Sequence, residues 1–453
     1  MAQSSRGVTL PGSLLSAVHM AGEKFLKYIR IGQKLHPVLV QPRPVFHNVP
    51  QLVQQLPLPH GNRFLRHRAQ NPADVAVPAG QIPADTERAQ LFIIHNIGKG
   101  IFLPDPRVPV DSLRENCLLA YQHKTPDYIP CFYTDMSLIQ ACPEMERYTG
   151  MTSGKDYWGC DWTYEDNIHA CLPTPNQYLF TEIGDWKEKL HFPDLDAIDW
   201  KKQADIDVHS DFMAFVMGYG LHPREDGKSV YDEDKARVCM VLNGMFERLH
   251  ACMGFENTLM ALVEDPDACR EYFHAMALWK SAYFRKIGEY YQMDIINAHD
   301  DYGSNDRMFM SPELWRELIK PELALMVEAC HEAGMIYQHH SCGYIEPILP
   351  DLVEIGMDAI DTLQACNRNL PELKKKYGDK ITFCGGFDNM HVLDVPGVST
   401  DAVKKEYRRV IDSLAPGGSY VIYPIGGTFD FVGPFLEEHF AYGMHFYENP
   451  NNR

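Results

Sequence analysis

The chain has 453 residues, which is enough for one large domain with an extension or for two or three smaller domains. Hydrophobic residues make up 45% and charged residues 23%, the usual balance for a globular protein in water. No uninterrupted apolar run of about 18 residues occurs, so we expect no membrane span. The formal net charge of -19 argues against nucleic acid as a partner.

The first residues and the cysteines indicate the compartment. Met1 to Leu15 lacks the long apolar core and the small-residue cleavage site of a secretory signal. The 12 cysteines show no paired spacing, and in a chain of this length they do not read as a disulfide framework. We therefore expect a cytoplasmic protein whose cysteines are mostly small buried apolar residues.

Residues 1–105 form a predicted N-terminal extension that is basic, rich in proline and poorly ordered. Nine prolines fall between Pro37 and Pro83, a density that breaks helices and central strands. Residues 106–453 are the predicted folded domain. Its first elements are a helix beginning near Asp111 and a strand from Tyr128 to Tyr133, followed by an irregular aromatic and acidic insertion over residues 150–200.

From Val238 onward, predicted strands and helices alternate. The predicted strands are 238–243, 294–299, 335–342, 359–364, 381–384 and 420–424, and the predicted helices are 265–291, 311–332, 345–355, 370–377, 402–414 and 432–447. This order predicts a parallel α/β sheet, with a closed (β/α)8 TIM barrel of roughly eight strands as the favoured architecture. A doubly wound open sheet is the alternative, although no glycine-rich nucleotide-binding motif follows a strand.

The segment Met335 to Gly343 carries the strongest chemical signal. His340 and Cys342 are two residues apart at the end of a strand, so both side chains point to one face, and both are zinc ligands. Cys384 is our choice for the third ligand, with His299 and the Asp300/Asp301 pair as alternatives. The competing interpretation is one hydrogen-bonded histidine and one inert buried cysteine.

Other polar residues also follow the predicted strands, where chemistry collects in a barrel. Three acids, Asp300, Asp301 and Asp388, are candidate catalytic residues acting as general acid, general base or substrate anchor. Each could instead cap a helix or stabilise a turn. Candidate substrate-binding residues are Asn243, His299, Tyr302 and Gln364.

Several segments together resemble the uroporphyrinogen decarboxylase-like superfamily, which includes zinc-dependent methyltransferases that work with corrinoid proteins. The segments are Thr125-Pro126-Asp127, Asp300-Asp301-Tyr302-Gly303, Met310 to Trp315, His340-Ser341-Cys342-Gly343 and Gly385 to Asp388. The resemblance covers roughly residues 110–450. It implies a (β/α)8 barrel with its site at the carboxyl ends of the strands.

The superfamily offers two chemistries. Its decarboxylases carry an Arg-Gln-Ala-Gly-Arg-Tyr stretch that binds the substrate's carboxylates, whereas Tyr128 to Cys142 contains no Arg or Lys. Its methyltransferases carry His-x-Cys, which matches His340 and Cys342. Their usual third ligand is a cysteine in the Gly-rich last strand, which here reads Tyr423 to Gly427 without one, so that Cys384 would have to substitute.

The resemblance therefore implies a zinc-dependent methyltransferase. It would move a methyl group between a small-molecule donor or thiol acceptor and a corrinoid carried by a partner protein, with Zn2+ as Lewis acid. Two alternatives remain open at this point. One is a cofactor-free decarboxylase, and the other is a non-catalytic barrel that binds a corrinoid or a partner.

Overall fold

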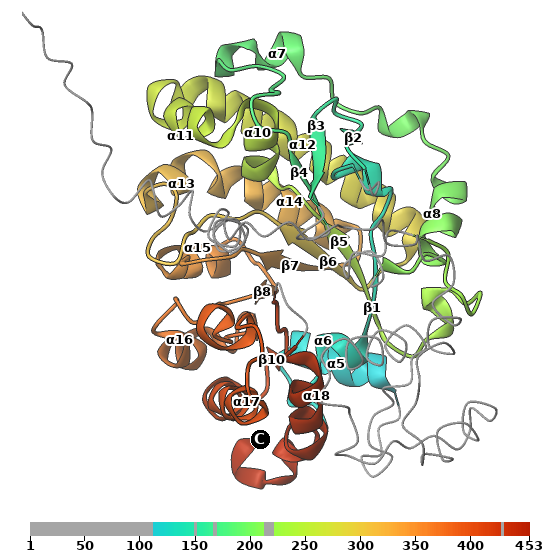
Figure 1. Ribbon diagram of the computed structural model, residues 1–453, viewed down its shortest axis with the longest axis vertical. Helices are drawn as coiled ribbons and strands as arrows, with labels where there is room; N and C mark the ends of the chain where they lie inside the picture. The colour runs from blue at the N-terminus through green and yellow to red at the C-terminus, as the bar shows by residue number, and fades with distance from the viewer. Residues whose placement is uncertain (1–111, 149–151, 166–169, 213–221, 427–429) are drawn as a thin grey trace, which may run out of the picture.

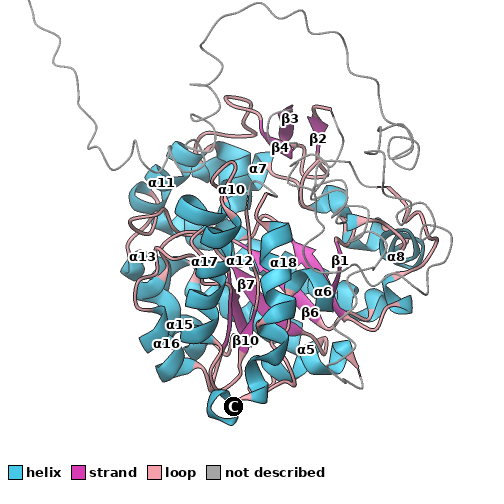
Figure 2. Ribbon diagram, turned by 60° about the horizontal axis from the view of Figure 1, so that its bottom comes forward, coloured by secondary structure: helices cyan, strands magenta, loops and turns pink. Residues whose placement is uncertain are grey.

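A computed structural model describes residues 112–148, 152–165, 170–212, 222–426 and 430–453 of the chain. In this part, helices surround a curled parallel sheet, as Figures 1 and 2 show. None of the described helices is long and apolar enough to cross a bilayer. The predicted N-terminal extension, residues 1–105, lies outside the described residues.

The main sheet has seven parallel strands in the order β1-β5-β6-β7-β8-β9-β10. They are β1 (Met136–Ile139), β5 (Ala236–Val241), β6 (Ile295–His299), β7 (Ile336–His340), β8 (Ala359–Asp361), β9 (Thr382–Cys384) and β10 (Tyr420–Val421). The predicted parallel α/β sheet is thus confirmed, whereas an eighth barrel strand is not found among the described residues.

The two ends of this strand order approach each other. Cys131, just before β1, forms a parallel bridge with Ile422, just after β10. Ile422 N donates to Pro130 O at 2.8 Å, and Phe132 N donates to Ile422 O at 2.9 Å. The sheet therefore curls toward closure, and the first and last described parts of the chain lie together, as the neighbouring α5, α6 and α18 show in Figure 1.

The predicted helices after residue 265 are found, with 311–332 divided into two, whereas α6, α7, α8, α10 and α11 were not predicted as helices. The helices are α5 (Leu113–Tyr121), α6 (Phe132–Asp135), α7 (Trp186–Lys189), α8 (Trp200–Val208), α10 (Met245–Met253), α11 (Phe255–Glu264), α12 (Pro266–Tyr291), α13 (Pro312–Leu318), α14 (Lys320–Glu332), α15 (Leu349–Glu354), α16 (Leu370–Tyr377), α17 (Thr400–Leu414) and α18 (Val432–Ala441). The Asp265 side chain accepts from Ala268 N and begins α12, with Pro266 at the first helical position.

Alternation along the strands separates two apolar layers. In β5, Val238 and Met240 face the inside of the curl, where α5 contributes Tyr121. Cys239 and Val241 point outward into the core shared with α12. Burying a large apolar side chain contributes about 1.5–3 kcal/mol to the free energy of folding. Both apolar layers therefore stabilise the sheet.

The chain between β1 and β5 contains a second, antiparallel sheet with the order β2-β3-β4. Its strands are β2 (Gly154–Lys155), β3 (Asp161–Glu165) and β4 (Ala170–Pro173). This sheet occupies the predicted irregular insertion.

A buried charge network, made of Glu146, Asp156, Arg248 and Lys280, joins the insertion to α10 and α12. Arg248 Nη1 lies 2.6 Å from Asp156 Oδ2, and Lys280 Nζ lies 2.9 Å from Glu146 Oε2, with all four side chains 0% exposed. The network therefore anchors the insertion to the helices that cover the main sheet.

The predicted strand from Tyr128 to Tyr133 is wrong. The Asp135 carboxylate accepts hydrogen bonds from Tyr128, Cys131 N and Thr134, and these bonds wrap the segment into a turn. Helix α6 begins at Phe132, and the first strand begins only at Met136.

Candidate metal centre

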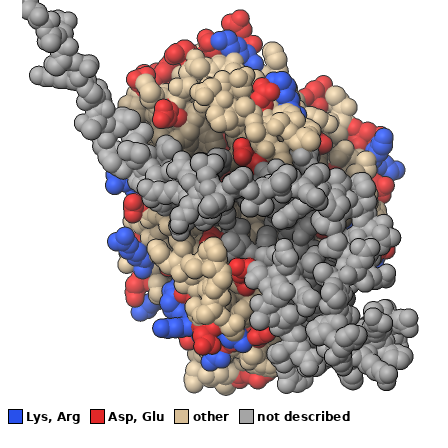
Figure 3. Space-filling model, viewed as in Figure 1, with Lys and Arg blue, Asp and Glu red and all other residues tan. Residues whose placement is uncertain are grey.

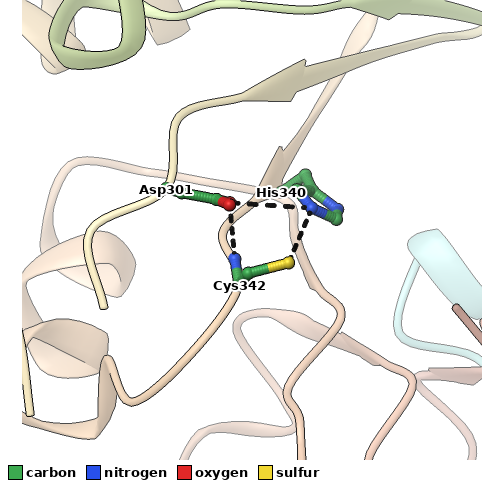
Figure 4. Close-up of side chains that lie close together, drawn as sticks. All are labelled: Asp301, His340 and Cys342. Atoms are coloured by element: carbon green, nitrogen blue, oxygen red, sulfur yellow. Dashed lines mark hydrogen bonds and ion pairs between the residues drawn. The ribbon is translucent and has the colours of Figure 1, made fainter. Parts of the chain in front are cut away.

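Asp301, His340 and Cys342 form a compact group of potential ligands, called here the metal cluster. Their ligand atoms all lie within 4.8 Å of one another. His340 Nε2 is 3.5 Å from Cys342 Sγ and 3.7 Å from Asp301 Oδ1, and Figure 4 shows the three side chains converging. His340 is 5% exposed, whereas the Asp301 side chain is 33% exposed, so the cluster remains reachable from one side.

The sheet register brings the three side chains together. β6 and β7 are parallel neighbours, and His299 pairs with His340 at their carboxyl ends. Cys342 N donates to Asp301 Oδ1 at 2.7 Å, which ties the loop after β7 to the loop after β6. Gly343 has φ of 82°, and a Cβ there would lie 2.2 Å from Gly303 O, so only glycine allows this close approach.

Asp361, at the end of β8, sets the orientation of the His340 ring. His340 Nδ1 lies 2.5 Å from Asp361 Oδ1, which leaves Nε2 to face the cluster. Burial lowers the pKa of His340, but the Asp361 carboxylate and Cys342 outweigh burial and raise it well above its usual value. A carboxylate behind a ligating histidine is the usual arrangement in metal sites, where it fixes the tautomer and the ring.

The choice of Cys384 as third ligand is not supported by the geometry. The strand order places β8 between β7 and β9, and two strand spacings of about 4.8 Å separate Cys384 from His340. The Cys384 thiol lies 3.9 Å from Gln338 Oε1 inside the curl, where burial raises its pKa well above the usual range. Asp301, one of the alternatives from the sequence, joins the cluster instead.

Asp300 and Tyr302 have other partners. Asp300 Oδ1 accepts from Glu247 N at 2.8 Å, and Oδ2 accepts from Phe246 N at 3.1 Å and from the Tyr302 hydroxyl at 2.9 Å. Burial raises the pKa of Asp300 to about 6. The acid therefore caps the first turn of α10, and Tyr302 packs against His339 in the sheet–helix core, away from the roles predicted for both.

Three further candidate residues hold loops in place. Asp388 accepts from His391 N at 3.0 Å and caps the turn Asn389–Leu393. Gln364 Oε1 accepts from Gly343 N at 2.6 Å, directly behind the Cys342 loop. Asn243 donates its side-chain amide to Glu146 O. Their side chains thus shape the surroundings of the cluster rather than entering it.

His299 is the predicted substrate-binding residue that lies against the cluster. Its ring stacks on that of His340, with centroids 3.9 Å apart and planes 14° apart. Its Nε2 lies 3.0 Å from Asn297 Oδ1. Burial and the neighbouring His340 lower the pKa of His299 well below its usual value, so the ring is neutral and forms one wall of the site.

Sequence reasoning missed Glu247 and Arg147. Burial and the carboxylates of Asp301 and Asp300 raise the pKa of Glu247 to about 8, while His340 and Arg147 oppose this rise. Burial lowers the pKa of Arg147, and Glu247 opposes that shift. The position of Glu247 just after β5 could have identified it, because strand ends collect functional residues.

On the face shown in Figure 3, Lys and Arg side chains are interspersed with Asp and Glu over the part that is not grey. Among the described residues, the metal cluster is the group of potential metal ligands that the structure brings together.

Comparison with known proteins agrees with the sequence motifs. Residues 233–426 match the family described as "Uroporphyrinogen decarboxylase (URO-D)". No curated protein matches the chain. One similar solved structure, a methyltransferase from Methanosarcina mazei, is 14% identical with a TM-score of 0.48, over 72% of this chain and 98% of that one. The segment from residue 233, before β5, to residue 426, after β10, is therefore similar to the uroporphyrinogen decarboxylase family, as the sequence motifs indicated.

Proposed function

We propose that this protein is a zinc-dependent methyltransferase that moves a methyl group between a small molecule and a corrinoid carried by a partner protein. The metal cluster is the single observation that supports the proposal most strongly. One nitrogen, one sulfur and one oxygen donor lie within 4.8 Å of one another. Such a mixed set suits zinc, and three protein ligands leave a fourth position for substrate.

The chain's own residues prepare the site for this chemistry. Asp361 holds the His340 Nδ1 proton and so leaves Nε2 as the ligand atom. Cys342 and Asp301 supply negative charge opposite it, and the loop bond between them fixes their spacing. Zinc bound there would supply Lewis acidity to the heteroatom that gains or loses the methyl group.

Decarboxylation is the competing function, because the matched family is named after a decarboxylase. A porphyrinogen with many carboxylates needs several cations. Tyr128 to Cys142, the segment through α6 and β1, contains neither Arg nor Lys. The negative charge of Asp301 in the metal cluster would repel such a substrate further. The charge balance therefore favours methyl transfer.

Metal analysis of the purified full-length protein tests the proposal. We expect about one zinc per chain in the wild type and almost none in Cys342→Ala or His340→Ala. Cys384→Ala is the matched control, because its thiol faces Gln338 and should leave zinc unchanged.

A methyl-transfer assay with zinc-loaded protein, a corrinoid protein and a panel of methyl ethers, methylamines and thiols completes the test. Absence of zinc in the wild type, or unchanged zinc in Cys342→Ala, would contradict the metal site. Metal-independent conversion of uroporphyrinogen would instead establish the decarboxylase.

A further inference from the structure

We propose that Cys160 and Cys252 are a redox modification site, at which hydrogen peroxide closes a reversible disulfide between the insertion and α10. Cys160 lies in the turn between β2 and β3, and Cys252 lies in the last turn of α10. Their Sγ atoms are 3.6 Å apart, although 92 positions separate the two residues in the sequence. The pair is separate from the metal cluster and does not depend on the proposed function.

Hydrogen bonds hold the turn that carries Cys160. Asp156 Oδ1 accepts from Cys160 N at 2.9 Å and from Trp158 N at 3.0 Å. Asp156 N in turn donates to Cys160 O at 3.2 Å. The backbone on both sides of the Cys160 sulfur is therefore fixed by one carboxylate and one closing hydrogen bond.

The same carboxylate ties this turn to the helix that carries Cys252. Arg248 precedes Cys252 by four positions, so the two side chains share one face of α10. Arg248 Nη1 lies 2.6 Å from Asp156 Oδ2, and Leu179 N donates to Cys252 O at 2.8 Å. These bonds keep the two sulfurs facing each other. A disulfide bond is about 2.05 Å long, so the sulfurs need to approach by about 1.5 Å.

Arg248 also makes Cys160 the more reactive of the two thiols. Its Nη1 lies 3.8 Å from Cys160 Sγ. The contact with Cys252 and the positive charge of Arg248 lower the pKa of the Cys160 thiol, although burial opposes them. Burial raises the pKa of Cys252 well above its usual value. Because the thiolate is the form that attacks a peroxide, Cys160 reacts first and Cys252 completes the disulfide.

The reaction balances with hydrogen peroxide as the oxidant. The Cys160 thiolate attacks one peroxide oxygen, the O–O bond breaks, and the released hydroxide takes up the proton that Cys160 lost, which gives water and a sulfenic acid. The Cys252 sulfur then attacks the Cys160 sulfur, so that the S–S bond forms and the S–O bond breaks. The leaving hydroxide takes the Cys252 proton and becomes the second water. Two thiols thus lose two electrons, which reduce one peroxide.

The turn also offers the oxidant a route to the pair. Cys160 is 1% exposed and Cys252 is 0% exposed, but Tyr157, in the same turn as Cys160, is 54% exposed. The turn therefore lies at the surface of the protein. Local opening of such a segment needs less free energy than global unfolding, and it is enough to admit a small peroxide.

Treatment of the purified full-length protein with increasing amounts of hydrogen peroxide tests the pair. Catalase ends each reaction, iodoacetamide blocks the remaining thiols, and mass spectrometry of the digest reads each cysteine in its own peptide. We expect a peptide that links Cys160 to Cys252 at a lower peroxide dose than the one that oxidises Cys366, a more exposed thiol whose pKa burial raises to about 12. Dithiothreitol should restore both thiols. Oxidation of Cys342 in the metal cluster is read separately.

Two variants assign the roles within the pair. In Cys252→Ala, Cys160 should remain a sulfenic acid, which dimedone labels, whereas in Cys160→Ala the Cys252 thiol should stay free at the same dose. Cys269→Ala is the matched control, because it removes another fully buried thiol from α12 and should leave the link unchanged. The proposal is overturned if Cys160 and Cys252 both stay reduced when Cys366 is oxidised, if either is linked to another cysteine, or if dimedone labels Cys252 in Cys160→Ala.

Discussion

The buried charge network and the metal cluster are two groups of polar side chains that are built differently. In the buried charge network, each cation faces an anion, as Arg248 faces Asp156 at 2.6 Å and Lys280 faces Glu146 at 2.9 Å. In the metal cluster, three potential ligand atoms converge on one another, namely His340 Nε2, Cys342 Sγ and Asp301 Oδ1. Together they could bind an external cation. The paired charges of the network stabilise the fold, whereas the converging ligand atoms of the metal cluster are arranged to bind a ligand.

The largest expected effect breaks the network. Asp156→Ala leaves Arg248 buried without its counter-charge, and removing one partner of a buried pair costs about 3–5 kcal/mol. Chemical denaturation would measure the loss in the free energy of unfolding. Lys187→Ala removes an exposed pair, since Lys187 and Glu271 are each 60% exposed, and should cost less than about 1 kcal/mol. Equal losses in the two variants would refute the distinction.

The second prediction separates two adjacent acids. Asp301→Ala removes a cluster ligand and should weaken zinc binding by more than the roughly hundredfold effect of an outer-shell change. Asp300→Ala should keep zinc but lose about 0.5–2 kcal/mol of stability, because it removes the cap of α10. Competition with a chromogenic chelator measures the first effect, and thermal unfolding measures the second. Reversed outcomes would exchange the roles assigned to the two residues.

The third prediction concerns the residue behind the cluster. Asp361→Asn retains the size of the side chain but removes the charge that orients His340, and zinc affinity should fall about 10–100-fold. Chelator competition again provides the measurement. Asp388→Asn, which alters a cap elsewhere on the sheet edge, is the control and should leave the affinity unchanged. An unaltered zinc affinity in Asp361→Asn would show that the Asp361 carboxylate is not needed to orient the His340 ring.

The smallest expected effect concerns one buried lysine, Lys374, which has no carboxylate partner like that of Lys280. Lys374 Nζ donates to the Gly418 carbonyl at 2.8 Å, and burial lowers its pKa to about 8, below the value of about 10.4 that it has when unfolded. The folded state therefore loses this proton first as pH rises. Between these two values the stability of the wild type relative to Lys374→Met should increase with pH, by at most about 1.4 kcal/mol per unit.

Denaturation at several pH values would measure this slope. Lys374→Met is the reference because it keeps the length of the side chain without its charge. A relative stability that stays flat or falls with rising pH in this window would show that the Lys374 ammonium is not destabilised by its site.

The sequence predicted the long elements well where local chemistry decides them. Helix α12 runs from Pro266 to Tyr291 as predicted, because the Asp265 cap and the following proline define its start. The predicted strand from Tyr128 failed because the Asp135 carboxylate, several residues later, folds the segment into a turn. Hydrogen bonds from one side chain to a nearby turn produce no periodic pattern in the sequence, so the pattern could not reveal them.

The site was predicted in part for the same reason. The spacing of His340 and Cys342 predicted that the two side chains lie close together. The structure places only His340 on β7, whereas Cys342 lies in the loop that follows, beyond the end of the strand. Choosing between Cys384 and Asp301 required the strand order. Strand β8 separates Cys384 from β7, whereas the loop that carries Asp301 follows β6, the direct neighbour of β7. Which strands are neighbours depends on the whole sheet, and no local pattern encodes it.

The pairing of Asp156 with Arg248 also limits how this fold can change. The chain between β1 and β5 supplies an anion to a helix that covers the main sheet. A shortened relative without this insertion would leave Arg248 buried without a counter-charge, unless Arg248 in α10 were replaced at the same time. Loss of the insertion and replacement of Arg248 should therefore occur together, so the insertion is not an exchangeable module.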